Sequence, residues 1–115
     1  MSKKERIQIE REVHEMLQFV AEKKERLQLM RYNIEKKAGI VKENKRCLQL
    51  VRLEALGIED MNARSKVNAK IKDLESTIDD SAFTLATLRS DTRRLSKLIQ
   101  EMEARLARIN KALQA

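Results

Sequence analysis

Residues 55–62, which read ALGIEDMN, lie between two long heptad patterns and decide the fold. Before this stretch an apolar residue recurs every seven positions, and we designate that position a. The a row of the first half is Val13, Val20, Leu27, Ile34, Val41, Leu48 and Ala55. Extending this row past Gly57 would reach Asn62 and Ala69, whereas the next observed row begins at Ile71. The heptad phase therefore shifts by two residues across 56–60.

The other seam position, d, supports the same two patterns. In the first half it is occupied by Ile9, Met16, Lys23, Met30, Lys37, Asn44, Val51 and Ile58, with three polar interruptions. In the second half the a row is Ile71, Ile78, Leu85, Thr92, Ile99, Leu106 and Leu113, and the d row is Val67, Leu74, Ser81, Leu88, Leu95, Met102 and Ile109. Sustained a and d rows of this kind predict coiled-coil helices.

The chain is therefore expected to be all-α, a long antiparallel helical hairpin that forms a two-helix coiled coil. The predicted single domain, 1–115, has a helix over about 3–56, a turn at 57–59 and a helix over about 60–113. We expect Gly57 to end the first helix in the left-handed conformation and Asp60 to cap the second. Gly39 keeps the heptad phase and is expected to be tolerated inside the first helix. The alternative is one continuous rod with a stutter at Gly57.

The pairing register of the hairpin follows from the position of the turn. A turn centred near 57–58 makes the numbers of paired residues sum to 115, which sets Leu48 opposite Val67 and Lys23 opposite Thr92. A register one heptad longer, with sums of 122, also fits the pattern. In either register we expect the ammonium group of Lys23 to extend out of the seam along its aliphatic stem.

Composition argues against an enzyme. Aromatic residues make up 3% of the chain, Trp and Pro are absent, and charged residues make up 37%. We find no phosphate-binding, dinucleotide or zinc motif, and we expect no cofactor, metal or small-molecule substrate. His14 is interpreted as a solvated helix-surface residue. Cys47, the only cysteine, is interpreted as a small buried apolar residue and not a nucleophile.

Apolar residues outside the seams predict a docking face. A hairpin buries only its a and d positions, and leaving several large apolar side chains exposed favours association. We therefore expect the fold to be completed by self-association or by the helices of a partner. The predicted docking residues are Leu17, Phe19, Tyr32, Leu50, Leu53, Leu56 and Phe83.

The formal net charge is +7, from 25 Lys and Arg against 18 Asp and Glu. The predicted contacts with an acidic partner are Lys36, Lys37, Lys42, Lys45, Arg46, Arg89, Arg93, Arg94 and Lys97. Such rows suit phosphates or the acidic surface of a cytoskeletal polymer. They also suit a solvated flank with ion pairs such as Glu22–Arg26 and Glu101–Arg105.

These features favour a non-enzymatic structural or adaptor subunit over a nucleic-acid-associated protein that grips phosphates. We expect its partner to be helical, or another copy of the chain, with an acidic surface such as a microtubule preferred over nucleic acid. No apolar stretch approaches the length of a membrane span, so no membrane insertion is expected. The single cysteine and the charged first residues favour an intracellular, reducing compartment, either the cytoplasm or the cytoskeleton.

Overall fold

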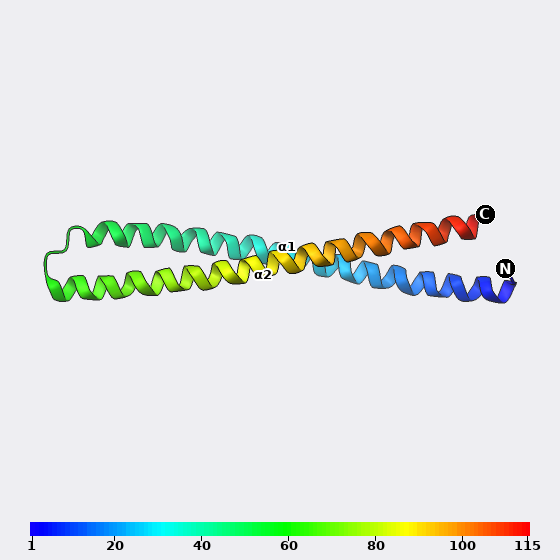
Figure 1. Ribbon diagram of the computed structural model, residues 1–115, viewed down its shortest axis with the longest axis horizontal. Coiled ribbons are helices and arrows are strands. Elements are labelled where there is room, and N and C mark those ends of the chain that lie inside the picture. The colour runs from blue at the N-terminus through cyan, green and yellow to red at the C-terminus, as the bar shows by residue number, and fades with distance from the viewer. The chain divides into compact units, whose positions relative to one another are not determined.

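The computed structural model describes all 115 residues and contains two helices (Figure 1). Helix α1 spans Lys3–Ala55 and helix α2 spans Met61–Gln114. The prediction of an all-α helical hairpin is confirmed, and the continuous rod is wrong because 56–60 interrupts the helix. The helix ends lie within one residue of the predicted ones.

The chain divides into two compact units, each built from part of both helices. The terminal unit comprises Met1–Arg31 and Ser90–Ala115, and the loop unit comprises Tyr32–Arg89. In the terminal unit, buried residues of both helices form one apolar cluster around Val20, Leu27 and Ile99. The loop unit contains the connection between the helices.

Helix α1 begins with a capping box that the heptad analysis did not consider. The backbone N–H of Glu5 donates to Ser2 Oγ at 3.1 Å, and the backbone N–H of Ser2 donates to Glu5 Oε2 at 3.4 Å. This reciprocal pair uses two backbone donors that a helix start would otherwise leave without an intrahelical acceptor. The sequence signal is Ser2 followed three residues later by Glu5.

The turn differs from the prediction at Gly57. No residue of the chain has a positive φ, so Gly57 is not left-handed. Instead α1 tightens into short-range bonds, in which the N–H groups of Leu56, Gly57 and Ile58 donate to carbonyls three residues earlier at 3.1–3.3 Å. Asp60 does cap α2, because its Oδ1 accepts the N–H of Asn62 at 3.4 Å.

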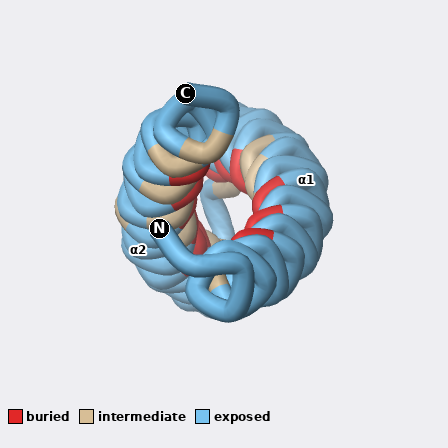
Figure 2. The backbone as a smooth tube through the Cα atoms, turned by 90° about the vertical axis from the view of Figure 1, so that its right-hand side faces the viewer, coloured by how far each residue is buried: buried red, intermediate tan, exposed pale blue.

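The predicted seams are the buried sides of both helices. Every a and d residue named above is buried or half-buried, and none is exposed. Figure 2 shows the buried positions of each helix on the side that faces the other helix. The heptad rows therefore identified the packing surface of each helix residue by residue.

The contacts between the helices fit the longer register. Arg52 pairs with Glu75 at 2.9 Å in the loop unit. Lys24 pairs with Glu103 at 3.3 Å in the terminal unit. A sum of 115 would separate Arg52 and Glu75 by about 18 Å along the axis, whereas a sum of 122 separates them by about 7.5 Å. Both side chains tilt toward their own N-termini and close that gap.

The register of 115 was therefore wrong, and so were the two facing pairs that it set, Leu48 with Val67 and Lys23 with Thr92. The prediction of 115 assumed a turn with equal arms. The turn is asymmetric instead, because α2 begins beyond the end of α1 (Figure 1). In the register of 122, Lys23 lies level with Ile99.

Polar residues in the seams are accommodated locally. The Lys23 ammonium lies over the Phe19 ring, 4.9 Å from its centroid. This contact agrees with the predicted extension of the side chain out of the seam, and a cation over an aromatic face is attracted by it. Ser81 and Thr92 are buried, yet no buried side-chain N or O atom lacks a hydrogen-bond partner.

Candidate functional site

The residues that could bind a metal ion are spread along both helices. No cluster of three or more His, Cys, Asp or Glu residues could hold a metal ion. His14 is exposed, and its Nε2 lies 3.5 Å from the amide nitrogen of Gln18. Cys47 is exposed, so the prediction that it is buried was wrong. It lies beside the seam but outside the contact between the helices.

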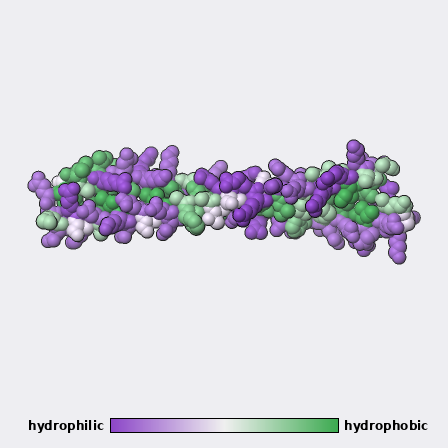
Figure 3. All heavy atoms as spheres, in the orientation of Figure 1, coloured by the Kyte–Doolittle hydropathy of each residue, from purple (hydrophilic) through white to green (hydrophobic).

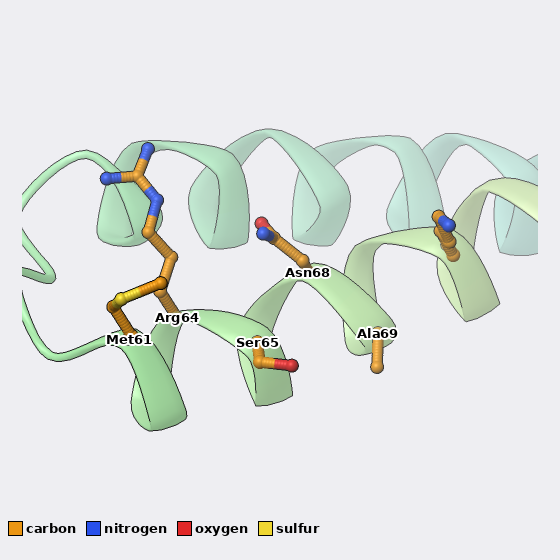
Figure 4. A pocket seen from close by; sticks show the side chains of 6 residues that line it. Met61, Arg64, Ser65, Asn68 and Ala69 are labelled. Atoms are coloured by element: carbon orange, nitrogen blue, oxygen red, sulfur yellow. The ribbon is translucent and has the colours of Figure 1, made fainter.

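The surface depressions do not enclose a ligand. One lies at the start of α2, and all of its lining residues come from that helix: Met61, Arg64, Ser65, Asn68, Ala69 and Lys72. Figure 4 shows that the labelled side chains point in different directions and do not meet at a common point. Arg64 uses one guanidinium nitrogen to donate to the Ile58 carbonyl at 3.4 Å, which ties α2 to the turn. The residues around this depression therefore belong to the first turns of α2 and to its contact with the turn.

All of the predicted docking residues are exposed, but the structure does not gather them in one place. Leu17 and Phe19 lie in the terminal unit, where Phe19 already contacts Lys23. Tyr32 and Phe83 lie on the outer sides of α1 and α2, away from the seam. No single face therefore carries the whole set.

Leu50, Leu53 and Leu56, which we call the loop-end cluster, follow one another at intervals of three residues at the end of α1. Their exposed fractions are 57%, 61% and 75%. Figure 3 shows apolar surface over this end of α1. Residues three apart on a helix are neighbours, so the cluster presents one apolar surface.

Sequence reasoning missed one exposed apolar residue near the turn. Met61, the first residue of α2, is 85% exposed. The sequence contained a signal for this residue, because Met61 directly follows the predicted capping residue Asp60 and so opens the second helix. Its exposure depends on the register, which leaves the first residues of α2 beyond the end of α1.

The predicted basic contacts are exposed, except Lys37, which is half-buried at a seam position. None of these nine residues takes part in an ion pair. The chain has three ion pairs: Arg6–Glu10, Lys24–Glu103 and Arg52–Glu75. The expected pairs Glu22–Arg26 and Glu101–Arg105 are not formed. Six of these nine residues belong to the loop unit and three to the terminal unit.

No helix is long and apolar enough to cross a membrane. No protein-family model, curated protein or solved structure matches the chain.

Proposed function

We propose that the protein is a non-enzymatic structural or adaptor subunit that docks a helical partner and orients it through basic residues. The observation that carries the proposal is the loop-end cluster. Burying a Leu side chain is worth about 1.5–3 kcal/mol, so three neighbouring exposed Leu residues favour association. Leu50, Leu53 and Leu56 lie outside the hairpin seam, so the hairpin's own pairing leaves them exposed.

The basic residues of the loop unit favour a partner of acidic character. Lys42, Lys45 and Arg46 precede the loop-end cluster on α1, are exposed and form no ion pair. Free cations beside an apolar surface attract acidic surfaces over several ångströms and help to fix orientation. An acidic cytoskeletal polymer such as a microtubule fits this chemistry, with the protein joining it to a second helical component.

The test is co-sedimentation of the protein with stabilised microtubules at low salt. We expect binding, and we expect the triple change Lys42→Glu, Lys45→Glu and Arg46→Glu to weaken it at least about tenfold, or ~1.4 kcal/mol. The matched control makes the same change in net charge within the terminal unit, at Lys3, Lys4 and Arg11. It should weaken binding much less, because those residues lie far from the cluster in sequence.

A nucleic-acid function is the second candidate, because Arg89, Arg93 and Lys97 form an exposed row at intervals of four residues on α2. Phosphate contacts release counterions, so such binding would fall steeply with salt. Titration with duplex RNA and duplex DNA at ~50 mM salt separates the candidates. Binding to a duplex without binding to microtubules would replace the structural proposal, and binding to neither would remove the acidic polymer from both.

A further inference from the structure

The two flanks of the loop unit differ in charge. The Arg52–Glu75 ion pair marks one flank, because these two residues meet beside the seam. Residues seven apart lie on the same side of a coiled-coil helix, so Lys45 and Ala82 share that flank, and Arg89 extends it. We call the exposed residues on this side the basic flank: Lys42, Lys45, Lys72, Ala82, Ala86 and Arg89.

The opposite flank lies on the other side of the same seam. Cys47 directly precedes the buried Leu48 on α1, and Thr77 directly precedes the buried Ile78 on α2. We call the exposed residues on this side the acidic flank: Ile40, Glu43, Cys47, Asp73, Thr77 and Asp80.

Within residues 42–52 of α1 and 72–89 of α2 the two flanks carry opposite net charges, and Lys70, one heptad before Thr77, lies just outside these ranges. Over 42–52 and 72–89 the basic flank has four cations, Lys42, Lys45, Lys72 and Arg89, against the one unpaired acid Asp79, a net charge of +3. Over the same ranges the acidic flank has three acids, Glu43, Asp73 and Asp80, and no cation, a net charge of −3. None of these seven charged residues nor Asp79 forms an ion pair within the chain.

The acidic flank also has features that suit contact with another helix. Ile40 is 46% exposed, and its neighbour along the flank, Cys47, is also exposed. The Thr77 hydroxyl donates to the Asp73 carbonyl at 2.9 Å, so its hydrogen is used within the helix. Thr84 does the same with the Asp80 carbonyl at 3.0 Å. Covering these threonines would leave no hydroxyl hydrogen without an acceptor. On the basic flank, the small side chains of Ala82 and Ala86 let a facing helix approach closely.

From this complementarity we infer that a second copy of the chain occupies these surfaces, with the basic flank of one copy on the acidic flank of the next. The inference rests on the proposed function, since it makes another copy one acidic partner of the basic residues. Two acidic flanks or two basic flanks would repel each other. The contact is therefore heterologous, and each copy retains one free flank from which assembly continues.

The test uses two variants that each lose one flank. The first carries Lys42→Glu and Lys45→Glu and keeps its acidic flank. The second carries Glu43→Gln and Asp80→Asn and keeps its basic flank. Each is expected to sediment as a monomer of 13.4 kDa, whereas the wild type forms larger species at low salt. An equimolar mixture should give a 1:1 heterodimer that does not grow, because its two remaining flanks are the altered ones and both carry a net negative charge.

Cys47 reports which flank is covered. In the mixture, the thiol of the first variant should react with a maleimide at least several-fold more slowly than alone, because its acidic flank is buried. The thiol of the second variant should keep its rate. Replacing Cys47 by Ser in one variant at a time assigns the signal. Circular dichroism melts check that both variants are folded, and the neutral pair Lys42→Gln and Lys45→Gln serves if the reversal unfolds the helix.

Three results would overturn the inference. A wild type that stays monomeric at low salt and high concentration removes the self-contact while leaving the microtubule test of the proposed function intact. Variants that still dimerise alone show a symmetric contact that does not use these flanks. A mixture of folded variants that does not pair shows that the charges do not direct assembly, and slow reaction of both thiols in the mixture has the same meaning.

Discussion

The terminal unit and the loop unit contain parts of the same two heptad patterns, and they differ in how their exposed apolar residues are grouped. The seam of the terminal unit has two polar residues, Lys23 and Thr92, and its buried residues form a contiguous apolar cluster. The seam of the loop unit has three polar residues: Lys37, Asn44 and Ser81. Its outer surface carries the loop-end cluster, Tyr32, Ile40 and Phe83.

This difference suggests a division of roles. A seam rich in apolar residues stabilises the pairing of the helices, because burial of apolar surface is the main favourable term. A seam with polar residues contributes less, and apolar residues outside the seam gain only when another chain covers them. Buried apolar residues line the seams of both units, five in the terminal unit and six in the loop unit, so both seams should stabilise the hairpin. The loop-end cluster makes the loop unit the one that should provide the surfaces for association.

The largest expected change in the free energy of unfolding comes from a substitution in the seam of the terminal unit. Ile99 is 4% exposed within the apolar cluster, so Ile99→Ala should lower the free energy of unfolding by about 2–4 kcal/mol. The adjacent Leu98 is 42% exposed, and Leu98→Ala should cost less than about 1 kcal/mol. Denaturant melts at matched protein concentration measure both. Equal losses would show that burial in the seam of the terminal unit does not determine how much a residue contributes to stability.

A substitution in the seam of the loop unit should raise the free energy of unfolding, by a smaller amount. Asn44 is half-buried at a seam position, and Asn44→Leu should raise the free energy of unfolding by about 1 kcal/mol. Asn110→Leu, at an exposed position of the terminal unit, should change it by less than about 0.5 kcal/mol. A loss of stability for Asn44→Leu would mean that this amide makes a contact that the loop unit needs.

Replacing Gly39 should also raise the free energy of unfolding, and it does not alter a seam position. A Cβ built at Gly39 meets no atom within 4 Å, and the residue lies inside α1. Gly39→Ala should therefore stabilise the protein by about 0.5–1 kcal/mol, the helix-propensity difference between the two residues. Thermal melts of the two proteins check this, and a fall in the midpoint would place an unseen contact against the outer side of α1.

The smallest effect is expected at Gly57. A left-handed Gly57 would make Gly57→Ala cost about 1–2 kcal/mol. Its φ is not positive, and the new Cβ would meet only the Glu54 carbonyl oxygen at 3.8 Å. The same change should therefore stabilise by about 0.5 kcal/mol, through the unfolded chain. Melts at matched concentration distinguish these signs, and a clear loss would restore the left-handed turn.

The helices and their buried sides could be predicted because heptad spacing reports directly which side of a helix is covered. The phase shift across Gly57 also located the turn. The register could not be predicted from the same pattern, because sums of 115 and 122 align the same a and d rows. The ion pairs of Arg52 with Glu75 and of Lys24 with Glu103 separate them.

The exposed residues were predicted less completely than the seams. The loop-end cluster stood out because three Leu residues lie outside the heptad rows. The two flanks did not, since their opposite charges emerge only after the register places α1 beside α2. Cys47 was misplaced because its position next to Leu48 does not determine how far the partner helix reaches around the seam.

Hydrogen exchange at several protein concentrations tests most directly whether the loop unit, and not the terminal unit, carries association. Backbone amides report local opening segment by segment. We expect protection of 40–50 and 73–84 to rise with protein concentration at low salt, while protection of 13–27 and 99–109 stays constant. Protection that rises equally in both units, or only in the terminal unit, would contradict the account.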